Sequence, residues 1–274
     1  WEDGEPGTAL ELWVGWGGAG SIEPLFVGTS HAVEVEFTPS VGGSVAVSGY
    51  GRLHEMMRGV VERSWSDTTV VDVAREVLSS YFPEVTVEGS TSTRNRIIQH
   101  DQNDYRFVRQ LAAEYGFEFY TERDTAYFTP RSSLGGDPDM TLTYGNTLDT
   151  FSAELTMAEQ LESVEVRYWD MNAEKEIVGS ASKPSGEGKK VFRIACDSKE
   201  EAEHIAESKL SELSMARATG YGQTDGIPEL TAGMTVRIEG IGDRFGGNYY
   251  VTRVAHRMQG NGYRATFDVK ELPE

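Results

Sequence analysis

The first fifty positions of the chain alternate between apolar and polar residues in the manner of half-buried β-strands. The pattern predicts three strands, at residues 9–16, 25–37 and 44–50. In the second of them Val33, Val35 and Phe37 share one face, and Glu34 and Glu36 lie on the other. We therefore expect this part of the chain to form a β-sheet with one apolar face.

Three later segments have apolar residues at helical spacing, and local signals mark their ends. The predicted helices cover residues 70–81, residues 103–115 and a segment that begins at residue 197 or 198. Pro83 ends the first helix and Gly116 the second. Ser198 and Glu201 have the spacing of a capping box at the start of the third.

The rest of the chain returns to strand patterns. Strands are predicted at residues 85–87, 117–120, 126–129, within 140–168, and at 191–194, 234–238, 249–256 and 263–272, with an exposed loop at 182–190. This order of elements is not a regular βαβ alternation. We therefore expect an α+β fold with mainly antiparallel sheets rather than a doubly wound parallel sheet.

Length and composition are those of a globular protein of one large or two modest domains. The chain has 274 residues, of which 38% are apolar and 10% aromatic, which is too rich for intrinsic disorder. It lacks a run of about 18 apolar residues, so no membrane span is expected. Trp1 stands where a signal peptide or an initiating Met would begin, and we expect the sequence to be a stretch of a longer polypeptide.

The charge balance is strongly acidic. Asp and Glu number 44 against 25 Lys and Arg, which gives a formal net charge of -19. This charge argues against a nucleic-acid-binding surface, because neutralising phosphates requires clustered Lys and Arg. A high-salt habitat and an anion-repelling channel wall are both compatible with such acidity, and composition alone leaves the two open.

Two glycine-rich segments carry the letters of a nucleotide-binding loop. Residues 15–20 fit G-x-G-x-x-G, but Pro24 and the strand that follows leave no room for the helix that would hold a pyrophosphate. We expect a hairpin loop there. Residues 240–247 lie between two strands, and the same interpretation applies to them.

No residue pattern predicts catalysis or metal binding. The histidines lack the H-x-x-x-H spacing of metal ligands, so packing or surface roles are expected for His31, His54, His100, His204 and His256. Cys196 precedes a helix start but is expected to be a small buried side chain. Four aromatic residues could form a ligand platform, although strand packing is the stronger interpretation for Tyr249, Tyr250, Tyr263 and Phe267. We expect no catalytic, cofactor or metal site.

Two hairpins in the sequence resemble each other. Residues 25–33 followed by 44–50, and residues 249–256 followed by 263–269, both have an aromatic residue and Val at their second and third positions and carry a His further along. The similarity is weak evidence for two related β-domains whose sheet edges could pair with other copies.

Longer motifs resemble a known family. Residues 99–120 (QHDQNDYRFVRQLAAEYGFEFY) are similar to the Q-x-(D/E)-x-x-(D/N)-x-x-F-(L/V)-x-x-L-A-x-x-x-G stretch of the phage late control D family. That family comprises baseplate hub proteins of contractile tails, with relatives among type six secretion spike proteins. A matching segment at 57–81 comes just before this stretch, as in the family, and others follow at 226–238, 245–256 and 262–267, so that the resemblance covers roughly residues 23–269.

The resemblance implies a fold and an assembly. It implies two tube-like antiparallel β-barrel domains with an inserted α+β region: residues 1–62 as the first β-domain with its N-terminal strands missing, 63–145 as the insertion, and 146–274 as the second β-domain with one packed helix. It also implies a homotrimeric ring that adapts a sixfold tail tube to a threefold spike. Because the sequence ends without a spike domain, the spike is expected to be a separate chain.

The expected partners and location come from the same resemblance. They are the tail tube ring, the spike, baseplate wedge proteins and a tape-measure protein, with DNA only as passing cargo and no cofactor. The expected location is the baseplate of a virion tail or an extracellular injection particle, assembled in the host cytoplasm. We further expect many carboxylates on the outer surface, as in a halophilic host, in addition to any in the bore.

Two other functions stay open from the sequence. A tail-tip cell-wall hydrolase would show a cleft with paired carboxylates or clustered histidines and would clear cell walls in zymography. A carbohydrate- or receptor-binding β-domain would line a groove with exposed aromatic residues. The non-enzymatic hub is the favoured hypothesis.

Overall fold

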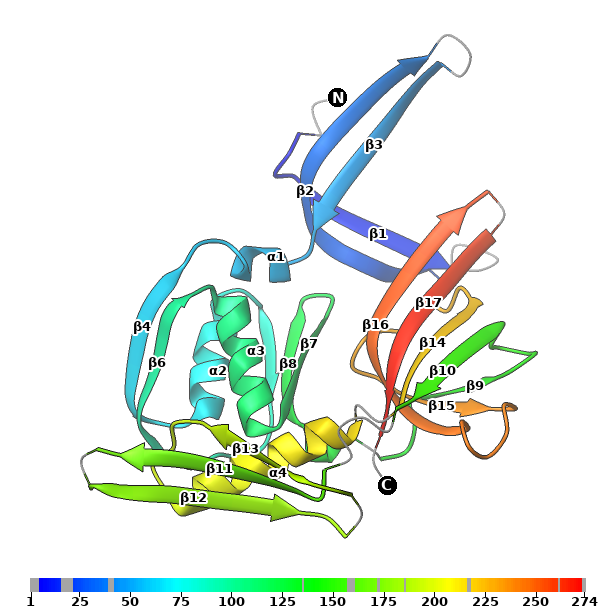
Figure 1. Ribbon diagram of the computed structural model, residues 1–274. Helices are drawn as coiled ribbons and strands as arrows, with labels where there is room; N and C mark the ends of the chain where they lie inside the picture. The colour runs from blue at the N-terminus through cyan, green and yellow to red at the C-terminus, as the bar shows by residue number, and fades with distance from the viewer. Residues whose placement is uncertain are drawn as a thin grey trace.

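The computed structural model consists of an N-terminal arm, a central α+β body and a C-terminal sheet (Figure 1). The structure describes residues 5–15, 22–38, 42–134, 136–156, 161–171, 173–184, 186–215, 218–260 and 262–272. Strands outnumber helices, and the two do not alternate regularly, in agreement with the α+β prediction.

The arm is built from three strands, and all three lie side by side over only a residue or two of their length. They are β1 (Ala9–Gly15), β2 (Ile22–Thr38) and β3 (Gly42–Tyr50). The first half of β2 pairs with β1, and its second half pairs with β3. The arm is therefore a bent ribbon of two strands, and it projects away from the body (Figure 1). A short helix, α1 (Leu53–Met56), leads into the body.

The central body surrounds two helices with two small sheets. Its elements are β4 (Val61–Thr68), α2 (Val70–Ser79), β5 (Glu84–Val87), β6 (Arg94–Gln102), α3 (Asp104–Tyr115), β7 (Phe117–Glu122), β8 (Thr125–Pro130) and the 3₁₀ turn η1 (Arg131–Ser133). The side chains of Thr69 and Asn103 cap the two helices, each accepting a backbone N–H. Gly116 ends α3 at a φ of 77°, a left-handed conformation that suits glycine.

A second layer covers this body. It consists of β11 (Ser163–Asp170), β12 (Lys175–Ser182), β13 (Lys189–Arg193) and α4 (Lys199–Met215). The buried faces of α4 and of this sheet share one hydrophobic core with α2 and α3. The core therefore extends across residue 145/146. The division of the chain at 62/63 and 145/146 stays a prediction about folding units.

The C-terminal sheet has a hydrophobic core of its own. Its strands, in spatial order, are β10 (Thr150–Leu155), β14 (Ala218–Asp225), β17 (Gly262–Glu271), β16 (Gly247–Gln259), β15 (Thr235–Glu239) and β9 (Met140–Thr143). All neighbours are antiparallel except β9 and β15. The four aromatic residues considered as a ligand platform are buried here, which confirms packing for Tyr249, Tyr250, Tyr263 and Phe267.

The α+β class is confirmed, but the expectation of two tube-like antiparallel β-barrel domains is not. Across the described residues the C-terminal sheet ends at two edge strands, β9 and β10, with no bonding between them. The arm is a ribbon rather than a barrel. The predictions also missed four strands, β4, β6, β12 and β14.

Candidate assembly surfaces

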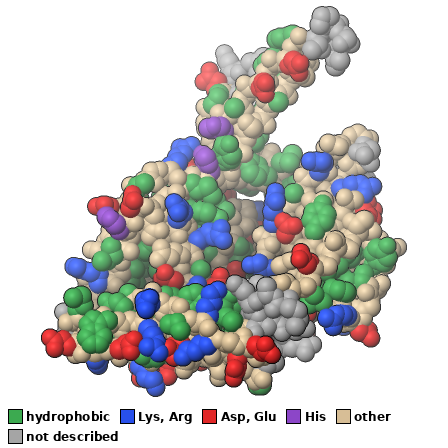
Figure 2. All heavy atoms as spheres, in the orientation of Figure 1, with side chains coloured by type: hydrophobic (Ala, Val, Ile, Leu, Met, Phe, Trp, Pro, Cys, Tyr) green, Lys and Arg blue, Asp and Glu red, His purple; other side chains and the backbone are tan. Residues whose placement is uncertain are grey.

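The arm carries an apolar face that the chain itself leaves uncovered. The register pairs Val33 with Val47 and Val35 with Val45, so these side chains share one face with Phe37. Phe37 is 81% exposed, and Val35, Val45 and Val47 are each close to half exposed. Figure 2 shows hydrophobic and acidic side chains along the arm, with His near its base, and residues 1–51 of the sequence contain no Lys or Arg. An exposed apolar face on a projecting element is typical of a protein–protein contact.

Three aromatic rings gather at the base of the arm. The Tyr50 ring stacks on His54 with centroids 4.1 Å apart. The centroid of the His31 ring lies 4.9 Å from that of Tyr50 and 6.0 Å from that of His54. Arg123 adds a tie to the body by donating to the carbonyl of Pro24 at 2.9 Å. Cavities of about 310 and 440 Å³ border this base. The structure thus brings two of the five histidines, His31 and His54, together in an aromatic cluster.

The sequence similarity between two hairpins corresponds to a shared geometry. The β2–β3 and β16–β17 hairpins point toward the same side of the molecule (Figure 1). Each has one unpaired extra residue in its first strand, His31 in β2 and Thr252 in β16. His31 lies seven residues before Thr38, the end of β2, and Thr252 lies seven residues before Gln259, the end of β16. A β-bulge at the same distance from the turn makes the two hairpins equivalent.

Residues of the 99–120 motif stabilise the central body and do not present reactive groups at the surface. Asp104 is 1% exposed and accepts hydrogen bonds from Arg63 at 2.7 Å, from the Tyr81 hydroxyl at 2.6 Å and from Gln99 at 2.7 Å. Burial, together with the bond to Asp104, raises the pKa of Tyr81 to about 12, so its hydroxyl stays a donor at neutral pH. This network joins β4, β6, α3 and the segment that follows α2.

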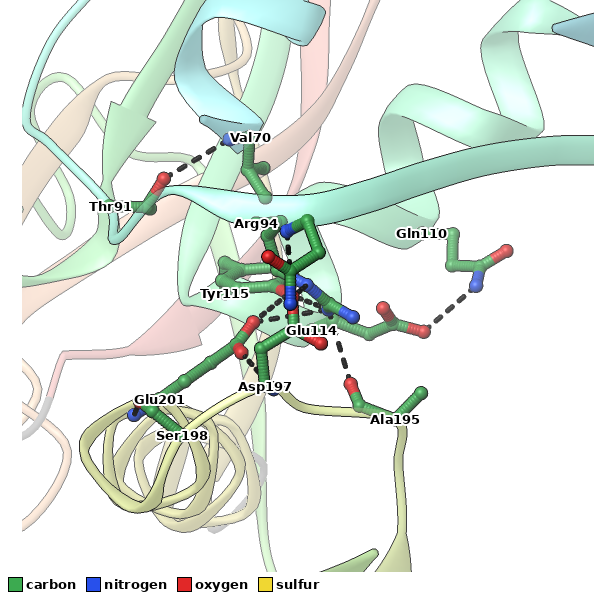
Figure 3. A network of polar contacts seen from close by, with 11 residues as sticks. Val70, Thr91, Arg94, Gln110, Glu114, Tyr115, Ala195, Asp197, Ser198 and Glu201 are labelled. Atoms are coloured by element: carbon green, nitrogen blue, oxygen red, sulfur yellow. Dashed lines mark hydrogen bonds and ion pairs between the residues drawn. The ribbon is translucent and has the colours of Figure 1, made fainter. Parts of the chain in front are cut away.

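A second polar network fastens α4 to the body (Figure 3). Arg94 on β6 lies 3.1 Å from a carboxylate oxygen of Glu201 and 3.4 Å from Asp197. The other Glu201 oxygen accepts the backbone N–H of Asp197 at 2.7 Å, and Ser198 accepts the N–H of Glu201 at 3.1 Å. The predicted helix start is confirmed, and Tyr115 extends the network to the end of α3.

The third cavity, about 260 Å³, lies between the body and the C-terminal sheet. Its two carboxylates are already engaged: Glu118 pairs with Arg131 at 2.7 Å, and Glu212 pairs with Lys209 at 3.0 Å. Neither is therefore placed as an unpaired general acid or base. The paired carboxylates of a hydrolase cleft are not found at this cavity.

Cys196 and the two glycine-rich loops are the remaining candidate sites from the sequence. Cys196 is 1% exposed, and burial raises the pKa of its thiol to about 11, as expected of a packing residue. The loop at residues 240–247 joins the antiparallel strands β15 and β16, so it does not precede a helix. Most of the other glycine-rich loop, residues 16–21, lies outside the described residues, although the flanking strands β1 and β2 pair with each other.

His256 is packed in the C-terminal sheet with both ring nitrogens engaged. Its Nε2 lies 3.0 Å from the Leu230 carbonyl, and the Tyr263 hydroxyl lies 2.9 Å from Nδ1. A neutral ring that donates from Nε2 and accepts at Nδ1 satisfies both partners. Burial lowers the pKa of His256 below its ordinary value of 6.5.

This buried ring predicts a pH-dependent stability. Between the lowered folded-state pKa and the unfolded value of 6.5, only the unfolded chain binds the proton. The free energy of unfolding should therefore fall as the pH drops below 6.5, with this residue adding at most about 1.4 kcal/mol per pH unit. His256→Gln should reduce the slope of urea-unfolding free energy between pH 6.5 and 5. Equal slopes in the two proteins would contradict the prediction.

No group of three or more His, Cys, Asp or Glu side chains in the described part of the chain is arranged to hold a metal ion. Among the same residues, no helix combines the length and apolar character needed to cross a bilayer.

A projecting ribbon, two hairpins with matching bulges and an uncovered apolar face are typical of a protein that contacts other chains. The model of the phage tail baseplate hub (GPD) family matches residues 50–262, more than half of the sequence, and the chain belongs to this family. The resemblance seen in the sequence motifs is confirmed. The chain is thus a protein of the phage tail baseplate hub family, and the structural character of the family favours a non-enzymatic role.

Solved tail proteins share the fold across nearly the whole chain. The tail protein from Neisseria meningitidis MC58 has a TM-score of 0.71 at 13% identity, covering 97% of this chain and 88% of that one. The 43 kDa tail protein of prophage MuSo2 from Shewanella oneidensis has a TM-score of 0.71 at 11% identity, covering 97% and 82%. A type VI secretion component from E. coli has a TM-score of 0.60 at 14% identity, covering 91% and 60%. No curated protein sequence matches the chain.

Proposed function

We propose that the chain is the subunit of a homotrimeric baseplate hub that adapts a sixfold tail tube to a threefold spike. The observation that carries the proposal is the pair of equivalent bulged hairpins, β2–β3 and β16–β17, in each chain. Three chains present six such hairpins, which matches the symmetry of a sixfold partner, while the ring as a whole keeps threefold symmetry. The hub then contacts a tube ring on one side and a spike on the other.

The low intrinsic stability of the arm and its uncovered apolar face support assembly with other copies. A two-stranded ribbon is only marginally stable in water by itself, and the β2–β3 half of the arm has no second layer over its apolar face. A neighbouring copy can supply that cover. Wedge and tape-measure proteins are further proposed partners, with DNA as passing cargo, and the assembled particle is a virion baseplate or a free injection device formed in the host cytoplasm.

The distribution of carboxylates supports a high-salt habitat as part of the proposal. Of the described Asp and Glu residues, only Asp104, Glu165 and Glu201 are buried. The others lie at least partly on the surface, where hydrated carboxylates keep a protein soluble. Figure 2 shows them spread over the arm, the body and the C-terminal sheet. A charged bore and a halophilic surface are compatible in this arrangement.

The trimer is tested by making the arm polar. Val35→Ser with Phe37→Ser should abolish trimers in light scattering coupled to size exclusion. The unfolding free energy of the monomer should change by less than about 0.5 kcal/mol per site, because both side chains are already exposed. Negative-stain images of the unaltered protein should show rings.

A matched control removes apolar surface elsewhere. Ile98→Ser with Met171→Ser changes two exposed apolar residues outside the arm, 57% and 81% exposed, and should leave the trimer intact. An unaltered protein that remains monomeric at every concentration would overturn the proposed function.

A further inference from the structure

The two equivalent hairpins carry opposite charge on the same face. Counting back from the end of the first strand, Glu36 in β2 corresponds to Arg257 in β16, and both are two residues from the end. Six residues from the end, Ala32 corresponds to Arg253. The arm hairpin has Glu34 as a second carboxylate on this face, and no Lys or Arg precedes Arg52 in the sequence. One hairpin is therefore acidic where the other is basic.

The basic hairpin holds cations that its own chain does not fully neutralise. Arg257 lies directly opposite Arg264 in the β16–β17 register, and two like charges in such a pair destabilise a sheet. Arg264 reaches Asp149 at 3.0 Å, and Arg253 reaches Asp268 only at 3.9 Å while 76% exposed. Among the described residues, Arg257 has no carboxylate partner.

The acidic hairpin is the counterpart of this arrangement. Glu34 and Glu36 lie opposite Ala46 and Ser44, and neither carboxylate forms an ion pair with another described residue. Each hairpin thus has unpaired charge of one sign at equivalent places. Uncompensated charges of opposite sign at matching positions are the pattern of complementary surfaces.

Both hairpins also have free edges beside these charges. β3 pairs only with β2, and β16 pairs with β15 only up to Tyr250, so its distal edge is open. In the described chain the arm pairs with neither β16 nor β17. Phe37 and Met258, each one residue from the end of its strand, are 81% and 59% exposed. An open strand edge with exposed apolar residues is a site at which a strand of another chain can pair.

We propose that the arm hairpin of one copy lies beside the β16–β17 hairpin of a second copy, with Glu34 and Glu36 facing Arg253 and Arg257. This inference rests on the trimeric hub proposed above and names the surfaces that hold it together. A second copy is the occupant because each chain supplies one acidic and one basic hairpin of the same geometry, in the equal numbers that a closed ring needs.

Charge reversal with rescue tests the contact. The variants are Glu34→Arg with Glu36→Arg, Arg253→Glu with Arg257→Glu, and all four together. Each pair should weaken the trimer about tenfold at 0.1 M salt, because attraction becomes repulsion at two exposed sites. The fourfold variant should return to within about threefold of the original dissociation constant, since its charges are again complementary. Mass photometry measures each constant.

Two further variants provide a net-charge control and a milder form of the same test. Glu88→Arg with Glu207→Arg makes the same change of net charge at exposed carboxylates outside both hairpins and should leave the trimer unchanged. Glu34→Gln with Glu36→Gln is milder and should reduce the dependence of the dissociation constant on salt between 0.1 and 1 M, where screening removes ion pairs. This neutral pair tests the contact if a charge-reversed variant folds poorly.

The outcomes separate this inference from the proposed function. Trimers that tolerate both reversed pairs, or that the fourfold variant fails to restore, would overturn the contact and leave the trimeric hub standing. Absence of trimers from the unaltered protein would overturn both. Loss on each single-sided reversal with recovery in the fourfold variant supports the contact.

Discussion

Replacing Gly179 with alanine should destabilise the protein by about 3 kcal/mol, because overpacking at a rigid contact is costly. Gly179 lies in β12 where α4 crosses the sheet. An added methyl group would overlap the backbone of α4 at Ala202 and Glu203. A backbone cannot swing aside as a flexible side chain can, so the helix would have to move away from the core that it shares with α2 and α3.

Urea unfolding followed by circular dichroism measures this effect. Gly136→Ala is the matched control, since a methyl group there meets no atom within 4 Å, and it should change stability by less than about 0.5 kcal/mol. If Gly179→Ala unfolds at the same urea concentration as the unaltered protein, the close approach of α4 to β12 is not as the structure has it.

The helices were predictable because their signals are local. Thr69, Asn103 and Gly116 lie within a residue or a turn of the ends that they define, and apolar spacing identifies the buried stripe without knowledge of its partner. The missed strands differ in this respect. β4 and β6 form a sheet of two strands rich in polar residues, and their pairing joins segments some thirty residues apart.

The β4–β6 sheet depends on tertiary packing that the sequence does not display. Trp65 on β4 stacks against Phe107 of α3 with ring centroids 5.5 Å apart, and Ile97 on β6 is buried in the same core. A polar segment of this kind becomes a strand because a helix from elsewhere covers its few apolar residues.

The candidate surface was partly predictable. Alternation placed Val33, Val35 and Phe37 on one face, and the structure confirms it. The alternation predicts an apolar face but does not identify the segment that covers it. The exposure of Phe37 is therefore known only from the structure. The relation between the hairpins was visible in outline. Its register depends on the bulges at His31 and Thr252, which have no sequence signature.

Removing the Glu201 side chain should be the most destabilising polar substitution, costing about 3 to 5 kcal/mol. Glu201 is 3% exposed, and in Glu201→Ala the guanidinium of Arg94 would keep only Asp197, at 3.4 Å, as an ionic partner. The backbone N–H of Asp197 and the hydroxyl of Tyr115 would lose their acceptor as well. A buried charge left without its partner costs more than the pair contributes, because water cannot replace the carboxylate.

The neighbouring ion pair on the same helix provides the control. Glu203 pairs with Lys199 at 3.1 Å, but both side chains are well exposed, so Glu203→Ala should cost less than about 1 kcal/mol. Unfolding free energies of the two variants in the same buffer give the comparison. Because α4 is fastened to the body through Arg94, Glu201→Ala should also raise amide hydrogen exchange along α4 and at the end of α3 before the C-terminal sheet responds. Equal costs for the two substitutions would contradict the role assigned to the buried network.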